Sequence, residues 1–374
     1  MLILTNEEIE QLLTAEACLE ALEVAYREMG EGRAINRPRS DMYMPTPDPE
    51  TYYVFKTMAG AVPGFQVAAL RLCSDHIRWK KVAGFIRKDK MPVLPGNRWL
   101  GLILLFSARN AELLGIIPDG YIQKMRVGAS CAIAARHLSR QDARVLGLLG
   151  SGWQAGAHLD AICAVRPVQL VKVYSPNADR RRAFAEEWAR RRGIEVRALD
   201  QAEEVVRGAD IVVAATDAIE PVLKAEWVED GAFVGCVKHY ELGPELLNRC
   251  DVVVVNTRTW APENYISGLG DRRIDVHDPV PILIDLQQGR QPPAALHEVD
   301  WGAGLGWAQL AELGELVNGK ATGRTSPRQI TCFLNSIGIG IQFAAVAAKV
   351  YELARAKGLG RDLPIDWFVE SVHN

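Results

Sequence analysis

A glycine turn between an apolar segment and a helix-like segment most constrains the fold of this chain. Residues 144–149 read Arg-Val-Leu-Gly-Leu-Leu, a run suited to a strand that is buried on both faces of a parallel sheet. Gly150, Gly152 and Ala155 follow in the order G-x-G-x-x-A, and another apolar run begins about 20 residues later. This context predicts a βαβ unit that binds a dinucleotide, because the helix N-terminus faces the pyrophosphate.

Each position of this motif has a physical role. Gly150 permits the tight turn, Gly152 lets the backbone approach the pyrophosphate, and Ala155 keeps the helix close to the strand. We expect the cofactor to be bound by this loop and by residues that follow the next two strands. The expected residues are Gly150, Ser151, Gly152, Trp153, Gln154, Ala155, Ser175, Asn177, Arg180 and Thr216.

The end of the second strand bears on the choice of cofactor. An acid there would bind the ribose hydroxyls of NAD, but residues 174–177 read Tyr-Ser-Pro-Asn, with no acid before Asp179. Three arginines, 180–182, follow. A hydroxyl with nearby guanidinium groups favours the 2′-phosphate of NADP(H) over NAD(H). The alternative is that the arginines only face solvent.

Apolar runs recur through the middle of the chain, with helix-like segments such as Asp179–Arg192 between most of them. The runs span residues 144–149, 171–174, 211–215, 233–237 and 252–256. This alternation predicts an α/β fold with a doubly wound parallel sheet of the Rossmann type. At 374 residues, the chain is also long enough to form two domains.

The parts of the chain before and after this alternation have a different pattern of residues. The first part is predicted to be α+β, with strands at 51–56, 102–106 and 113–117 and a helix of small residues at 121–138. After Gly323 come a strand at 330–333 and a long apolar helix at 337–356. We expect this last helix to return to the first part.

Composition argues against several classes of protein. The formal charge of −3 gives no reason to expect nucleic acid, and the basic runs 180–182 and 190–192 are predicted to form a solvated helix face. No stretch approaches the roughly 20 apolar residues of a membrane span, and the N-terminus does not resemble a signal peptide. The cysteines are scattered singly, as in a reducing compartment, and the histidines lack metal-ligand spacing. We therefore expect a cytoplasmic protein without a metal site, a membrane anchor or a nucleic-acid partner.

Three stretches, in order along almost the whole chain, carry a family resemblance. They are Met44-Pro-Thr with Tyr53-Val-Phe-Lys56; Arg126-Val-Gly-Ala-Ser-Cys-Ala-Ile-Ala-Ala running into Gly150-Ser-Gly-Trp-Gln-Ala; and Gly323-Arg-Thr-Ser with Ile330-Thr-Cys-Phe and Ser336-Ile-Gly-Ile-Gly. In these stretches the chain resembles the ornithine cyclodeaminase/mu-crystallin family. The resemblance implies a homodimer in which a hydride moves between nicotinamide and the α-carbon of a small amino or imino acid.

The same resemblance implies how the domains divide. A Rossmann NAD(P)-binding domain is expected at 126–322. A discontinuous α+β substrate and dimerisation domain is expected at 1–125, completed by 323–374. The substrate pocket would lie between the two domains.

Three basic residues are the expected substrate ligands. Lys56 ends an apolar, aromatic strand, where an ammonium is costly to bury unless it is paired; the residues alone allow a lysine that reaches solvent, and the resemblance implies a site lysine. Arg126 is expected to bind a substrate carboxylate as a bidentate pair, with a structural salt bridge as the alternative. Arg39 resembles the first carboxylate-binding arginine of the family, and Arg37 is its rival because the spacing to Lys56 has one extra residue.

The chain also departs from the family. Where cyclodeaminases place a catalytic aspartate after the fourth Rossmann strand, this sequence has His239, and the last helix has Phe343 where an aspartate is usual. Histidine exchanges a proton near neutral pH, so His239 is the acid/base candidate, but it supplies no fixed anion for a second ammonium. Lys238 is the other candidate at this strand end. Ornithine is therefore not the expected substrate.

A basic segment within Arg71–Leu100 is longer than the family norm. Its cations are Arg78, Lys80, Lys81, Arg87, Lys88 and Lys90. Two interpretations stand side by side: the segment lines the pocket mouth and favours a substrate with a second anionic group, or it is a surface loop.

These features together predict an NAD(P)H-dependent imine (ketimine) reductase or amino-acid dehydrogenase. In that prediction Lys56 polarises the imine or carbonyl, Arg39 and Arg126 hold the carboxylate, and His239 exchanges the proton. The alternatives are a cyclodeaminase-type lyase that keeps its NAD bound, and a non-catalytic protein of the mu-crystallin type that binds NADPH and a small ligand.

Overall fold

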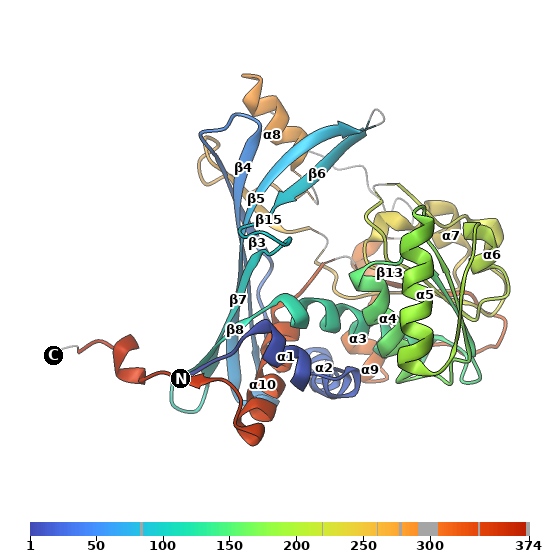
Figure 1. The fold of residues 1–374 in the computed structure, drawn as a ribbon, viewed down its shortest axis with the longest axis horizontal. Helices are drawn as coiled ribbons and strands as arrows, with labels where there is room; N and C mark the ends of the chain where they lie inside the picture. The colour runs from blue at the N-terminus through green and yellow to red at the C-terminus, as the bar shows by residue number, and fades with distance from the viewer. Residues whose placement is uncertain are drawn as a thin grey trace.

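The strands of the protein form two separate sheets, which helices connect (Figure 1). The computed structural model describes residues 1–82, 85–218, 220–259, 261–276, 279–290, 306–335 and 337–371. For residues 80–82 and 85–88 it describes the backbone alone. Ser336 of the third family stretch therefore lies outside the described residues.

The first sheet is built mainly from the N-terminal third of the chain, and within the described residues it has ten strands. They are β1 (Leu2–Ile3), β2 (Ile35–Asn36), β3 (Ser40–Pro45), β4 (Thr51–Val62), β5 (Val67–Val82), β6 (Phe85–Met91), β7 (Leu100–Ser107), β8 (Leu113–Pro118), β15 (Glu263–Ile266) and β18 (Arg361–Asp362). The order β15-β3-β4-β5-β7-β8-β1-β18 forms the sheet, with β2 paired to β4 and β6 paired to β5. The strands expected from the sequence are confirmed, and β4 continues well beyond the expected end at Lys56.

Helices cover one side of this sheet and join it to the second. They are α1 (Asn6–Leu12), α2 (Ala15–Gly30), α3 (Gly120–Leu138), α9 (Leu313–Val317) and α10 (Gly340–Lys357). α10 lies across β4 and β5, and it approaches β4 so closely that a Cβ on Gly60 or on Gly340 would overlap the backbone of the other element. The small residues of α3 serve the same purpose, since a Cβ on Gly128 would overlap the Ala157 carbonyl of α4.

The second sheet has eight strands in the described residues, in the order β11-β10-β9-β12-β13-β17-β14-β16, and every pair is parallel. The strands are β9 (Val145–Leu149), β10 (Leu170–Tyr174), β11 (Glu195–Ala198), β12 (Ile211–Ala214), β13 (Phe233–Cys236), β14 (Val252–Val255), β16 (Ala311–Glu312) and β17 (Thr331–Leu334). The helices of this part are α4 (Trp153–Cys163), α5 (Ala178–Arg192), α6 (Ala202–Val206) and α7 (Pro244–Arg249). α8 (Val280–Gln287) instead packs against the first sheet, where its Ile282 and Leu283 join the cluster of buried residues on β3, β4 and β5 (Figure 1). The predicted α/β fold with a doubly wound parallel sheet is confirmed.

Sheet membership departs from the expected domain division at two places. β17 follows the expected boundary at 323, yet it pairs between β13 and β14, because the chain completes the parallel sheet before it returns as α10. β15 lies inside the range 126–322, yet it pairs with β3 of the first sheet.

The basic segment forms a hairpin rather than an irregular loop. β5 and β6 pair in antiparallel register from His76↔Met91 to Val82↔Phe85, and in Figure 1 the hairpin rises from the sheet and bends toward the Rossmann half. Four of its cations, Lys80, Lys81, Arg87 and Lys88, have side chains outside the described residues.

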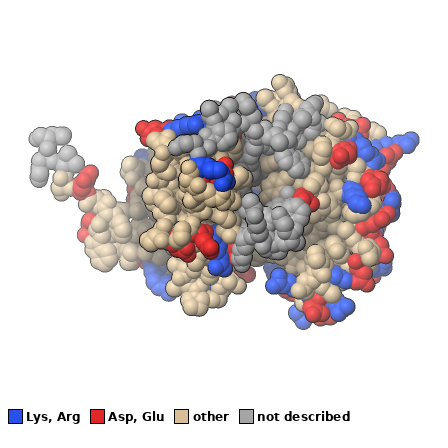
Figure 2. Space-filling view, turned by 90° about the horizontal axis from the view of Figure 1, so that it is seen from above, with Lys and Arg blue, Asp and Glu red and all other residues tan. Residues whose placement is uncertain are grey.

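Two surface properties bear on the expected partners. Within the described residues, no helix combines the length and the apolarity that crossing a membrane requires. On the face shown in Figure 2, the coloured basic and acidic side chains are interspersed over the Rossmann half and form no continuous basic surface of the kind that binds nucleic acid. The expected cytoplasmic location stays a prediction.

Candidate active site

The glycine turn lies at the carboxyl end of β9, beside a cavity of about 620 Å³. Gly150 has a φ of 114°, which side chains with a Cβ rarely allow, and a Cβ there would overlap the carbonyl oxygen of Ala215. A Cβ on Gly152 would instead point into open space. Gly152 is the N-cap of α4 and no side chain caps this end, so the first N–H groups of the helix are available beside the cavity. This cradle fits a pyrophosphate group.

The expected cofactor residues converge on this cavity. Nine of the ten line it: Gly150, Ser151, Gly152, Trp153, Gln154, Ser175, Asn177, Arg180 and Thr216. Ala155 does not line it, because its side chain is fully buried at the start of α4, in the packing role that the motif predicts. Contact of these residues with a cofactor stays a prediction.

The segment after β10 forms the rim where a ribose would lie. The Ser175 and Ser151 hydroxyls are 2.7 Å apart and join the two loops. The side chain of Asn177 caps α5 by accepting a hydrogen bond from the Arg180 N–H at 2.9 Å. Asn177 therefore has a structural use in addition to its place on the cavity wall.

The three arginines of 180–182 have different surroundings. Arg180 is exposed, lines the cavity and forms no ion pair with any described residue. Arg181 is buried, binds the Ser175 carbonyl at 3.0 Å and forms an ion pair with Asp200. Arg182 lies against Asp179 at 3.5 Å, away from the cavity wall. Of the three, Arg180 is placed to meet a 2′-phosphate.

Glu241 is a site residue that the sequence analysis missed. It lies in the 3-10 helix His239–Glu241 after β13 and is fully buried. One carboxylate oxygen accepts hydrogen bonds from the Thr216 N–H at 2.6 Å and hydroxyl at 2.7 Å, and the other accepts from the Val237 and Lys238 N–H groups at 3.0 and 2.9 Å. Burial raises the pKa of Glu241, although these hydrogen bonds oppose the rise. Glu241 thus fixes Thr216 at the cavity wall. The sequence feature that could have identified Glu241 is an acid shortly after a parallel strand.

His239 is at the carboxyl end of β13, as its position in the sequence predicts. The side chain is buried, and the ring lies edge-on to Trp307 with 6.1 Å between the ring centroids. The adjacent Tyr240 ring is 5.4 Å away, also edge-on. His239 therefore lies at the end of the parallel sheet where ligands of open α/β folds gather, but it is not among the residues that line the cofactor cavity, and its acid/base role stays a prediction.

The substrate side of the site is a charged face on the first sheet. Alternate residues of a strand point to one face, and the register places Asp41 opposite Lys56 and Lys56 opposite Cys73. The ionised side chains on this face are, in strand order, Arg39 and Asp41, then Lys56, then Arg71 and Asp75. We call these five residues the charged face.

Arg39, rather than Arg37, points onto the charged face. It forms a bidentate pair with Asp41, with Nε–Oδ1 at 2.8 Å and Nη2–Oδ2 at 2.5 Å, and Asp41 is fully buried. Arg37 is exposed. Arg39 therefore lies on the charged face and Arg37 at the surface, and which of the two binds the substrate stays a prediction.

Lys56 is buried on this face and does not reach solvent. Its Nζ donates to Asp75 Oδ2 at 2.5 Å, and Lys90 from β6 approaches the same oxygen at 3.0 Å. Burial alone would raise the pKa of Asp75, but the two ammonium groups lower it to about 2. Asp75 therefore remains ionised and stabilises the charged form of Lys56. The sequence analysis gave Asp75 no role.

Arg126 of α3 is buried without an acidic partner. Its Nη1 donates to Gln342 Oε1 at 3.0 Å, its buried Nε has no acceptor, and no described carboxylate forms an ion pair with it. Burial, followed by the charge of Arg71, lowers the pKa of Arg126 to about 9. The structural salt bridge proposed as the alternative is therefore absent from the described residues. A bound anion would stabilise the buried guanidinium.

Phe343 lies between two guanidinium groups. Arg71 and Arg126 each place their Cζ 5.1 Å from the centroid of its ring. Arg71 is neutralised by Asp119, with Nη2–Oδ2 at 2.6 Å, so Arg126 is the cation of the two without a carboxylate. An apolar ring at this position in α10 packs against both cations without adding a negative charge.

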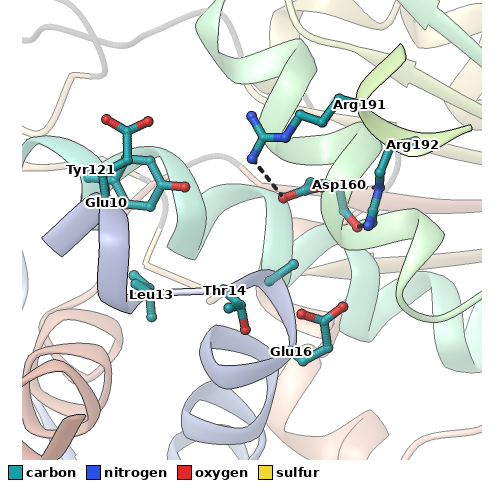
Figure 3. Close-up of a pocket in the computed structure, with 9 residues that line it drawn as sticks. Glu10, Leu13, Thr14, Glu16, Tyr121, Asp160, Arg191 and Arg192 are labelled. Carbon is teal, nitrogen blue, oxygen red and sulfur yellow. Dashed lines mark hydrogen bonds and ion pairs between the residues drawn. The ribbon is translucent and has the colours of Figure 1, made fainter. Parts of the chain in front are cut away.

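A second hollow lies apart from the cofactor cavity, between α1, α2 and the end of α5 (Figure 3). In it Arg191 and Arg192 both contact Asp160 of α4, at 4.0 and 3.2 Å. The basic run 190–192 is therefore only partly the solvated face that the sequence predicted, because two of its arginines pack α5 against its neighbours.

Fold and site together define a dehydrogenase or reductase of the Rossmann class, with a dinucleotide cradle facing a cationic substrate surface. Residues 1–358 match the model of the ornithine cyclodeaminase/mu-crystallin family, and the chain belongs to that family, as the sequence predicted.

Relatives and solved structures agree with this assignment. The alanine dehydrogenase of Archaeoglobus fulgidus is 28% identical over 371 residues, which cover 96% of this chain and 97% of that protein. The Δ1-pyrroline-2-carboxylate reductase of Thermococcus litoralis, solved with NADH and L-proline, has a TM-score of 0.72 at 26% identity and covers 97% of this chain and 100% of its own. An archaeal alanine dehydrogenase dimer with bound NAD has a TM-score of 0.71 at 26% identity, with 97% and 99% coverage. The predicted class, an NAD(P)-dependent oxidoreductase acting on carbon–nitrogen bonds, is confirmed.

Proposed function

We propose that the protein reduces the imine of a small 2-keto acid to the amino acid, or catalyses the reverse oxidation, with Arg126 holding the α-carboxylate. The observation that carries this proposal is the buried Arg126 guanidinium, which has no carboxylate among the described residues and lies beside the charged face. A substrate carboxylate would supply the missing anion as a bidentate partner. Arg39 and Arg71 lie close enough to Arg126 to lower its pKa, but each has a carboxylate beside it, so Arg126 is the cation that a substrate carboxylate would neutralise.

Lys56 is the proton donor in this proposal. Amine and carbonyl condense to an imine with loss of water, and the imine carbon then accepts a hydride while the nitrogen accepts a proton. When bound at the Gly150–Ala155 loop, the nicotinamide cofactor supplies that hydride. The Lys56 ammonium, kept charged by Asp75, donates a hydrogen bond to the imine nitrogen or carbonyl oxygen and makes the carbon more electrophilic. His239 exchanges the protons that imine formation and hydrolysis require.

The positions of His239 and Phe343 separate this proposal from cyclodeaminase activity. Neither residue offers a fixed anion to a second ammonium, and Phe343 is enclosed by two guanidinium groups that would repel one. The experiment is to incubate the protein with NADPH, a 2-keto acid and ammonia, and to identify the product by mass spectrometry. The corresponding amino acid is expected; net ammonia release from ornithine would favour the lyase, and tight NADPH binding without product would favour the binding protein.

NADP(H) is the proposed preferred cofactor. Support comes from Arg180, which lines the cavity without an ion pair in the described chain, and from the Ser175 hydroxyl at the end of β10. No acid stands at that strand end to bind the ribose hydroxyls of NAD.

A homodimer is the proposed assembly. The face of the first sheet opposite α10 carries half-buried apolar side chains that a second copy would cover. They include Phe55, Leu70, Leu72, Leu102, Leu104 and Phe106. Light scattering on the purified protein is expected to give twice the chain mass.

A further inference from the structure

The β5–β6 hairpin brings one of its cations to the substrate side of the site. Register pairs Lys90 with Ile77, and residues directly opposite in an antiparallel pair point to the same face. Ile77 lies two residues beyond Asp75, so it shares the face that carries Arg71, Cys73 and Asp75. Lys90 is therefore an extension of the charged face, supplied by the segment that exceeds the family norm.

Among the ion pairs of the described side chains, two cations share one carboxylate at this end of the face. Asp75 Oδ2 is shared by the ammonium groups of Lys56 at 2.5 Å and Lys90 at 3.0 Å. The Asp75 carboxylate thus forms ion pairs with two cations. Lys56 is buried, whereas the Lys90 side chain is 47% exposed. The Lys90 ammonium can therefore reorient to contact a ligand while it stays close to Asp75.

The cations of neighbouring elements are arranged one after another in the direction of β5. Arg71, which lies against the same ring as Arg126, is four residues before Asp75, a distance of roughly 13 Å at the rise of an extended strand. Lys56 occupies the row between them, opposite Cys73, and Lys90 lies beyond Asp75. A substrate held by its α-carboxylate at Arg126, with its reacting carbon at Lys56, would direct its side chain toward Lys90.

We propose that Lys90 binds a second acidic group, so that the enzyme acts on imines of dicarboxylic 2-keto acids in preference to monocarboxylic ones. This inference rests on the proposed function. A distal carboxylate would share the excess positive charge around Asp75, whereas a distal ammonium would be repelled by Lys90. Lys90 is thus a specificity residue and takes no part in the hydride or proton transfer.

The test compares 2-ketoglutarate and oxaloacetate with 2-ketobutyrate, each with ammonia and NADPH. The wild type is expected to show kcat/KM at least tenfold higher for the dicarboxylic acids, with the ratio falling at high salt because Lys90 is half exposed. Lys90→Gln is expected to remove most of that ratio by raising KM for the dicarboxylic acids, while 2-ketobutyrate changes less than twofold. Lys90→Arg keeps the charge and is expected to keep the preference.

Arg78→Gln is the matched control, because Arg78 lies in the same hairpin, is equally exposed and pairs with Asp89 on the opposite face. This variant is expected to behave as wild type. Equal kcat/KM for both classes in the wild type, or equal losses for both in Lys90→Gln, would overturn the inference and leave the proposed function standing. No turnover of any keto acid would overturn the proposed function itself, and the inference with it.

Discussion

The cofactor cavity and the charged face meet the same need, binding an anion, in different ways. At the cavity, backbone N–H groups at the start of α4 and a missing side chain at Gly152 provide the binding surface, with one exposed arginine at the rim. On the charged face, buried side chains provide it, and almost every cation there has a carboxylate beside it. The cavity therefore depends on local backbone geometry, whereas the charged face depends on the register of three strands and on two helices.

The largest effect is expected at the cavity. Gly152→Asp places a carboxylate in the open space where the pyrophosphate would lie, so NADPH binding is expected to fall below detection in calorimetric titration. The melting temperature is expected to stay close to that of the wild type, because a Cβ at this position meets no protein atom.

Gly152→Ala is the control for this variant and is expected to bind NADPH more tightly than Gly152→Asp by at least a hundredfold. If Gly152→Asp binds NADPH as the wild type does, the cradle lies elsewhere.

On the charged face, Arg126→Met separates function from stability. The change removes a buried cation that has no counter-ion in the described part of the chain. We expect kcat/KM to fall about 1000-fold, because a buried charge pair with the substrate is lost. The melting temperature is expected to stay level or rise, because the folded protein no longer carries the cost of burying this charge. NADPH affinity is expected to be unchanged.

A melting temperature for Arg126→Met that falls by several degrees, with both kinetic constants and NADPH affinity lost together, would show instead that Arg126 only supports the fold.

His239 lies at the carboxyl end of β13 and is expected to have a smaller effect. Histidine titrates near neutral pH, so His239→Asn is expected to lower kcat/KM about 100-fold and to remove one limb of its pH profile. The comparison uses the pH dependence of kcat/KM for both proteins. A profile of unchanged shape in the variant would leave His239 as a packing residue against Trp307.

The smallest effect is expected at the cavity rim. Arg180→Ala is expected to weaken NADPH binding about tenfold and NADH binding little, because the 2′-phosphate loses one exposed charge partner. Arg182→Ala, in the same helical turn but off the cavity wall, is the control and is expected to bind both cofactors as the wild type does. A wild-type preference for NADH by tenfold or more would contradict the proposed cofactor.

The difference between the two regions also explains what the sequence allows one to predict. The cavity lies at the carboxyl ends of parallel strands that the sequence pattern locates, so residues such as Gly152 after β9 and Thr216 after β12 were placed correctly around it. Asp75, Asp119 and Gln342 were missed because they come from β5, the end of β8 and α10. Only strand register and helix packing bring them to Lys56, Arg71 and Arg126, respectively. Lys90 was predicted only as one of several basic residues. The sheet face to which its side chain points follows from its pairing with Ile77, which the sequence does not reveal.

The most direct test of the proposed reaction is transfer of deuterium from the cofactor to the substrate carbon. With NADPH deuterated at the nicotinamide C4, a 2-keto acid and ammonia, we expect an amino acid that carries one deuterium on its α-carbon. Consumption of ornithine with ammonia release, no net oxidation of NADPH and no deuterium in any amino acid made from a keto acid would contradict it.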